Sequence, residues 1–162
     1  MNKCLQNILT SGERYDYIAR MDDDDLILGN KFQKQIELLE REPAISFCST
    51  LGALMNESGK VTNPTWDYAM DNGKPMIQRF LTGGCHIVHA ATMFRASMLY
   101  DRGHLWYNPL MRQVEDYVLW FRLLRLGYQY KLVPEHLYLY RVHSRQETRN
   151  NNEAKNQVCS LS

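Results

Sequence analysis

The sequence predicts an α/β fold in which a mixed β-sheet is flanked by helices. Segments with the apolar spacing of amphipathic helices alternate along the chain with short apolar runs typical of strands, and this order favours a layered α/β domain. The 162 residues are 44% hydrophobic and 23% charged, as in an ordinary globular protein. We expect one domain over residues 1–148 and a disordered polar tail over 149–162, which contains three consecutive asparagines.

Charge and cysteine usage exclude several classes of protein. The net charge is only +1, so the overall electrostatics give no reason to expect nucleic acid binding. The four cysteines form no CxxC pair, which favours reduced thiols in the cytosol over a zinc or redox site. The sequence contains no run of about 18 apolar residues, so no membrane span is indicated. We therefore expect a cytoplasmic protein without a transmembrane helix.

The first two elements are predicted from apolar spacing. A helix over Asn2–Ser11 places its apolar side chains on one face, and Gly12 is suited to end it. A strand follows over Tyr15–Met21, with Ile18 and Ala19 at its expected buried centre.

The clearest amphipathic helix covers Lys31–Glu42, between a possible cap at Asn30 and Pro43. Its apolar face is expected to consist of Phe32, Ile36 and Leu39. A strand over Ile45–Leu51 follows, and Ala53–Val61 is expected to form a hairpin that turns at residues 57–59.

The second half of the chain continues the alternation. A short helix is expected over Pro75–Leu81, a strand over Ala90–Arg95 and a buried helix over Val114–Leu126. Two strands, Tyr128–Pro134 and Leu137–His143, complete the predicted sheet.

Four consecutive carboxylates, Asp22–Asp25, come directly after the first predicted strand. Carboxylates this close repel one another unless they are solvated, protonated or bound to a cation. One interpretation is a solvated loop with a helix cap. The other is an Asp-x-Asp site for Mg²⁺ or Mn²⁺, because ligands bind at the carboxyl ends of strands in open α/β sheets. An EF-hand would need glycine at Ile27, and an aspartyl-phosphatase motif would need threonine at Leu26.

A second acidic pair, Glu115–Asp116, opens the buried helix. Acidic residues in a first helical turn are favoured by the helix dipole by ~0.3–1 kcal/mol, which is one explanation; a general base is the other. Trp120, one turn later, is expected to pack in the core. His143 follows the last strand and is either an ordinary histidine or a metal ligand beside the aspartates.

Five segments, in this order, resemble bacterial family 2 inverting glycosyltransferases. YIARMDDDD at 17–25 is similar to the family segment YIARMDADD. The others are KFQKQI at 31–36 (family RLEKQ), HAATMFR at 89–95 (HPSVMFRR), EDYVLWFRL at 115–123 (EDYDLWLRL) and YRVHS at 140–144 (YRVHS). The resemblance covers about residues 5–146.

This resemblance implies a GT-A fold, built of abutting Rossmann-like halves, that binds a nucleotide sugar, most often a UDP-sugar, through Mn²⁺ or Mg²⁺. Asp24 would be the main metal ligand, and Asp22 would bind the metal on the nucleotide side. Asp25 would lie near the cofactor, and His143 would contact the metal or the diphosphate.

The resemblance also implies how the reaction proceeds. Asp116, beside Glu115, would be the general base of a single displacement that inverts the anomeric carbon. Gly83–Gly84 would form a glycine loop, part of the cofactor-binding set, before the acceptor site. No Gln-x-x-Arg-Trp motif follows the base, which favours non-processive transfer.

Compared with the family pattern, the chain matches the C-terminal part of the catalytic domain and lacks the N-terminal nucleotide-binding segment. The primary hypothesis is transfer to a saccharide or lipid-linked acceptor during polysaccharide synthesis, with peripheral association at the inner face of the membrane as one possible location. The alternatives are a non-catalytic remnant and, more distantly, another metal-dependent phosphate enzyme. Strand edges left unpaired would favour homo-oligomers.

Overall fold

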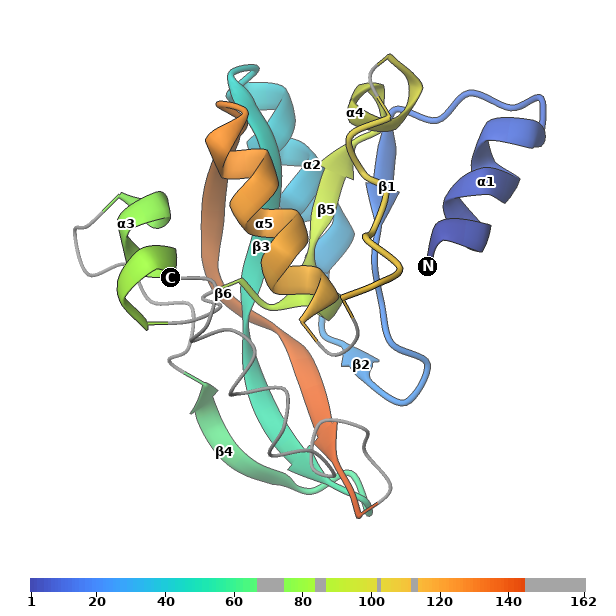
Figure 1. Ribbon diagram of the computed structural model, residues 1–162. Helices are drawn as coiled ribbons and strands as arrows, with labels where there is room; N and C mark the ends of the chain where they lie inside the picture. Colours follow the sequence, from blue (N-terminus) through green and yellow to red (C-terminus); the bar gives the residue numbers. More distant parts are fainter. Residues whose placement is uncertain (67–74, 84–86, 102, 112–113, 145–162) are drawn as a thin grey trace.

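The structure is a computed structural model that describes residues 1–66, 75–83, 87–101, 103–111 and 114–144 (Figure 1). Its elements are α1 (Asn2–Thr10), β1 (Tyr17–Ala19), β2 (Leu26–Ile27), α2 (Lys31–Arg41), β3 (Ile45–Asn56), β4 (Val61–Trp66), α3 (Met76–Gly83), η2 (His89–Ala91), β5 (Met93–Arg95), α4 (Ser97–Tyr100), α5 (Glu115–Arg125) and β6 (Gln129–Val142). The polar tail predicted over 149–162 lies outside the described residues.

A single mixed sheet organises the fold. The strand order is β1-β5-β3-β6-β2, and β4 also pairs with β3. The long strands β3 and β6 are parallel, from Ile45 opposite Gln129 to Asn56 opposite Val142, whereas the other pairs are antiparallel. The mixed sheet and its alternation with helices confirm the α/β prediction.

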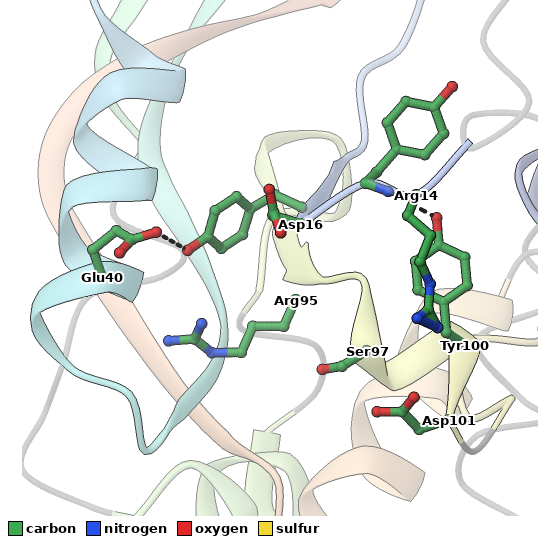
Figure 2. A pocket seen from close by; sticks show the side chains of 9 residues that line it. Arg14, Asp16, Glu40, Arg95, Ser97, Tyr100 and Asp101 are labelled. Atoms are coloured by element: carbon green, nitrogen blue, oxygen red, sulfur yellow. Dashed lines mark hydrogen bonds between the residues drawn. The ribbon is translucent and has the colours of Figure 1, made fainter.

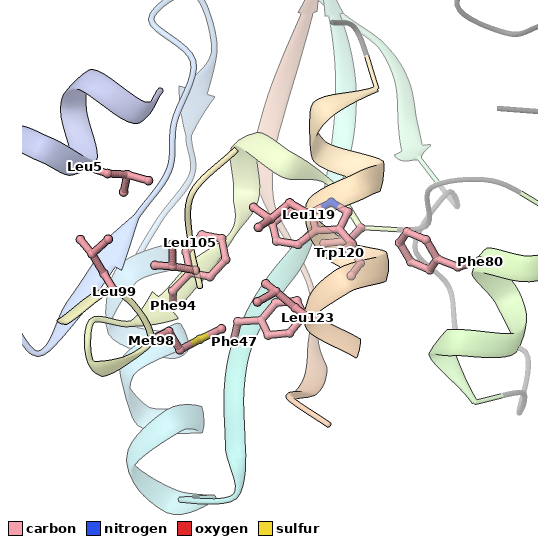
Figure 3. Close-up of a cluster of buried hydrophobic side chains, with 11 residues drawn as sticks. Leu5, Phe47, Phe80, Phe94, Met98, Leu99, Leu105, Leu119, Trp120 and Leu123 are labelled. Carbon is pink, nitrogen blue, oxygen red and sulfur yellow. The ribbon is translucent and has the colours of Figure 1, made fainter. Parts of the chain in front are cut away.

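Helices cover both faces of this sheet, with α2 on one side and α5 on the other (Figure 1). Successive side chains of β3 point to opposite faces of the sheet, because side chains alternate along a strand. Phe47 joins the cluster that includes α5, and Cys48 joins the cluster that includes α2. Fully buried Trp120 stacks on Phe47 at 5.5 Å and on Phe94 at 5.6 Å between ring centroids (Figure 3). Its expected core role is confirmed.

Two of the residues predicted to be buried are exposed. Ala19 is exposed, because its strand β1 lies at one end of the strand order and pairs only with β5 in the described part of the chain. Phe32 is 41% exposed, because α2 is rotated about its axis relative to the predicted face. The buried positions of α2 are Lys31, Gln35, Leu38 and Leu39.

The two predicted C-terminal strands are one strand, β6. The break expected at Pro134 survives as an irregularity in the pairing with β3. Val133 lies opposite Thr50, and the next paired residue, His136, lies opposite Leu51. Proline has no N–H to donate to a ladder, so the pairing passes over this position without ending the strand.

Lys31 is the least expected residue of the core. Its side chain is fully buried, and within the described ranges its ammonium has no hydrogen-bond partner. The Nζ atom lies over the ring of Phe32, at 4.8 Å from the centroid, and of Tyr138, at 5.9 Å. Burial lowers the pKa of Lys31 from its ordinary 10.5 to about 8. A depression of this size corresponds to about 3 kcal/mol against the charged form.

We expect the Lys31→Met variant to be more stable than the wild type at neutral pH. The unfolded chain binds more protons than the folded one between about pH 8 and 10.5, so wild-type stability gains from rising pH in this window. The advantage of Lys31→Met should therefore shrink from pH 8 to 10.5. Urea unfolding across this range measures both effects.

Lys34→Met on the same helix is the matched control, since Lys34 forms a surface ion pair with Glu135 at 2.8 Å. Its change in stability should be small. A Lys31→Met variant that is less stable than the wild type at pH 7, or that shows the same difference at every pH, would contradict this account.

Candidate functional site

The acidic run lies in the short connection between β1 and β2, the two ends of the strand order. Pairing of β2 with β6 sets the position of this connection, with Leu26 opposite Leu139 and Ile27 opposite Tyr138. The end of the acidic run is therefore fixed against the C-terminal part of β6.

Asp25 attaches the run to β6. Its side chain is buried, with 3% exposed. The Tyr138 hydroxyl donates to Oδ2, and the Arg141 backbone N–H donates to Oδ1 at 2.6 Å. Burial raises the pKa of Asp25, while the two hydrogen bonds oppose that rise. Both carboxylate oxygens are thus engaged by the protein itself.

Asp24 and His143 lie together. The Oδ2 atom of Asp24 is 2.9 Å from Nε2 of His143, although the two residues are 119 positions apart in the chain. The Arg141 side chain also contacts the acidic run, because its Nε donates to the Asp24 carbonyl at 2.6 Å. Both side chains of the pair keep access to solvent, with 39% of Asp24 and 23% of His143 exposed.

Asp22 faces a different partner. Its Oδ2 lies 2.6 Å from Nη1 of Arg20, the residue that follows β1. Asp23, which stands between Asp22 and Asp24 in the sequence, is exposed. The run thus contains a buried residue, Asp25, a solvent-accessible contact between Asp24 and His143, and an ion pair between Asp22 and Arg20. In the described part of the chain, three or more acidic, histidine or cysteine side chains do not gather as a ready metal site.

Glu115 and Asp116 open α5, as predicted. Burial raises the pKa of Asp116; the Tyr117 amide, which donates to Oδ1 at 2.7 Å, opposes that rise, and so does the positive charge of Arg20. Within the described residues, the buried Oε2 of Glu115 has no hydrogen-bond partner. Arg20, which pairs with Asp22, is therefore also one of the charges that act on the pKa of Asp116.

The charge of Arg20 also acts on the pKa values of two further side chains, His89 and Tyr107. His89 Nε2 lies 2.8 Å from the Tyr107 hydroxyl. Burial lowers the pKa of His89 to about 3, and the charge of Arg20 acts in the same direction, so this imidazole stays neutral. Arg20 and Tyr107 also border a mainly apolar hollow of about 130 Å³ between α1 and β1.

Sequence reasoning assigned no role to Arg20, Tyr138 or Arg141. Arg20 stands inside the YIARMDDDD segment, where a cation between an apolar strand and four carboxylates was an available signal. Arg141 interrupts the apolar end of β6 in the same way. Tyr138 gave no such signal, because an aromatic residue in a strand is ordinary core composition.

The remaining predicted residues are placed less informatively. Gly83 is the last residue of α3, and Gly84 lies outside the described residues.

A polar hollow of about 460 Å³ lies at the other end of β1, away from the acidic run, beside Arg14, Glu40 and Tyr100 (Figure 2). Tyr17 donates to Glu40 at 2.6 Å there. None of the predicted site residues lines this hollow.

The chain is similar to known proteins in sequence and in fold. The family model described as glycosyl transferase family 2 matches residues 9–103, more than half of the sequence. An uncharacterized glycosyltransferase of Haemophilus influenzae is 30% identical over 79% of this chain and 45% of its own length. The amylovoran biosynthesis glycosyltransferase AmsE of Erwinia amylovora is 27% identical over 83% of this chain and 45% of its own length.

Among solved structures, S. aureus TarS 1–349 in complex with UDP matches with a TM-score of 0.60. The match covers 87% of this chain and 38% of that one at 11% identity, which supports the GT-A-like fold. This chain spans about half the length of the curated relatives that it matches. Family model and relatives agree with the resemblance found in the five sequence segments: the chain belongs to glycosyl transferase family 2.

Proposed function

We propose that this chain forms part of an enzyme that transfers a sugar from a nucleotide-sugar donor, most simply a UDP-sugar, to a saccharide or lipid-linked acceptor with inversion and with help from a metal ion. The observation that carries the proposal is the 2.9 Å contact between Asp24 and His143. Sequence motifs 119 positions apart meet there. The AmsE relative and the UDP complex of TarS support the same reaction class.

The oxygen and nitrogen atoms of Asp24 and His143 are suitable ligands for a hard divalent cation. Carboxylate oxygens and a neutral imidazole suit Mn²⁺, and Mg²⁺ is commonly held by one or two carboxylates while water and substrate phosphate fill its other positions. Asp24 and His143 would hold the ion, with Asp22 beside them. A bound cation would offset the negative charge on the leaving diphosphate.

The residues of the chain then divide the work. Asp25 positions the run, since its carboxylate is occupied by Tyr138 and Arg141. Asp116, partly buried at the start of α5, accepts the proton of the acceptor hydroxyl as that oxygen attacks the anomeric carbon. Because burial raises its pKa, Asp116 is a stronger base than an exposed aspartate. One displacement inverts the anomeric centre.

The proposed donor site predicts stabilisation by Mn²⁺ together with UDP. Ligand at 100 times its Kd stabilises the folded state by about 2.7 kcal/mol. For a chain of this size, that corresponds to a rise of roughly 5–10 °C in melting temperature. We expect this rise for the wild type in differential scanning calorimetry, and a much smaller one for Asp24→Asn and for His143→Ala.

The exposed Asp101→Asn variant is the control and should keep the full shift. If neither Mn²⁺ with UDP nor Mg²⁺ with UDP moves the melting temperature of the wild-type chain, the non-catalytic remnant is the better description of this polypeptide.

Asp116→Asn should abolish proton transfer without removing the donor site. Loss of a general base reduces turnover by about 10²–10⁴-fold. The measurement is release of UDP from UDP-sugars by the full-length protein, compared with its shift in melting temperature, which should remain. The raised pKa of Asp116 adds a pH signature: wild-type turnover should fall as pH drops through this pKa, because the base becomes protonated. Unchanged turnover in Asp116→Asn would refute the assignment.

A further inference from the structure

The turn between β3 and β4, residues 56–60, is closed by its own hydrogen bonds. The Asn56 side chain accepts from the Lys60 N–H at 2.9 Å and from the Ser58 hydroxyl at 2.7 Å, and the Asn56 N–H donates to the Lys60 carbonyl at 2.9 Å. Gly59 has a φ of +83°, a left-handed conformation that glycine adopts without strain. The β3–β4 turn therefore has a defined shape at the end of β3.

This turn lies beside the end of β6, at the bottom of Figure 1. The Arg141 Nη1 donates to the Glu57 carbonyl at 2.9 Å and to the Asn56 carbonyl at 3.3 Å. The Nε atom of the same guanidinium donates to the Asp24 carbonyl at 2.6 Å. One planar side chain thus joins the turn to the backbone of the acidic run.

The turn also contacts the residue that follows His143. The Glu57 Oε1 atom accepts from the Ser144 N–H at 3.1 Å and from the Ser144 hydroxyl at 3.4 Å. On the other side of His143, Val142 lies opposite Asn56 in the parallel pairing of β3 with β6. The backbone of His143 is therefore held between two residues that are attached to β3 or to its turn.

The bonds from Arg141 and Ser144 are additional to those that close the turn, and both residues stand within two positions of His143. What these bonds determine is relative position, because a guanidinium carries its donors in one fixed plane. Changes to groups that orient metal ligands typically lower metal affinity by about 10–100-fold. The contacts thus have the arrangement expected of groups that support a binding site.

We propose that the β3–β4 turn is a positioning element of the donor site, in which Arg141 sets the position of the Asp24 backbone and Glu57 that of the His143 backbone. The effect on the metal ion and the nucleotide rests on the function proposed above. The attachment of the turn to Ser144 does not depend on that function.

Binding of Mn²⁺ in the presence of UDP tests the proposal, measured as loss of the free Mn²⁺ signal in electron paramagnetic resonance. We expect Glu57→Ala and Arg141→Lys each to weaken Mn²⁺ binding by about 10–100-fold. Lysine keeps the charge of Arg141 but lacks the planar set of donors that joins the turn to the acidic run.

Glu57→Gln separates geometry from charge. Glutamine keeps an oxygen that accepts from Ser144 but carries no negative charge, so this variant should bind Mn²⁺ nearly as tightly as the wild type. If Glu57→Gln binds as weakly as Glu57→Ala, the charge of Glu57 acts directly and its positioning role is wrong.

Glu37→Ala is the matched control, because Glu37 is also exposed and accepts a hydrogen bond from a side chain, Gln33 Nε2 at 2.9 Å, but on α2. It should leave Mn²⁺ binding unchanged. Wild-type binding in both Glu57→Ala and Arg141→Lys would overturn the proposal.

Amide hydrogen exchange of the metal-free chain separates this proposal from the proposed function. The Ser144 amide should exchange about tenfold faster in Glu57→Ala than in the wild type, because its acceptor is removed. Unchanged exchange would overturn the attachment of the turn. Faster exchange in Glu57→Ala, together with no Mn²⁺ binding by the wild type, would instead sustain the attachment and overturn the function.

Discussion

The hydrogen bonds of the buried Asp25 carboxylate to β6 are the constraint on which the rest of the site depends. A buried carboxylate is strongly unfavourable unless it is hydrogen-bonded, and here the Tyr138 hydroxyl and the Arg141 amide supply the donors. Once they are made, Asp24 lies beside His143, which directly follows β6 and stands two residues beyond Arg141. The hydrogen bonds of Asp25 and the antiparallel pairing of β2 with β6 thereby set the geometry of the acidic run.

Neighbouring aspartates in one run have different properties because their environments differ. Asp25 is buried and satisfied by protein donors, while Asp24 keeps solvent access and a histidine partner. A similar division separates Asp24 from Asp116, whose burial raises its pKa while Arg20 limits the rise. Environments that separate the behaviour of carboxylates are how active sites assign distinct roles to chemically identical groups.

Much of the fold could be predicted from sequence, because apolar periodicity reports helices and strands directly. The position of the aspartates after a strand was predicted from apolar spacing, and a site shared by Asp24 and His143 was implied by the family resemblance. The rotation of α2 did not, since burial of Lys31 and exposure of Phe32 depend on what β6 and η2 present to the helix. Gln35, for example, faces inward because its Nε2 donates to the Ala91 carbonyl at 2.9 Å. Such tertiary contacts leave no periodic signal.

The contacts of Arg20 could not be predicted from the sequence for a related reason. A basic residue next to four aspartates suggests a local salt bridge, and the Asp22 contact is one. Its charge also opposes the rise in the pKa of Asp116, which stands 96 positions later in the sequence, and no local pattern carries that information. The contact of Asp24 with His143 thus joins the ends of two strands far apart in the sequence, neither of which contains it alone.

The most direct test of the central constraint is a double-mutant cycle between Asp25→Asn and Tyr138→Phe, read as the free energy of unfolding in urea. A hydrogen bond to a charged group contributes about 1.5–3 kcal/mol, so the two changes should be coupled by about that amount. Effects that add to within about 0.5 kcal/mol would contradict the account.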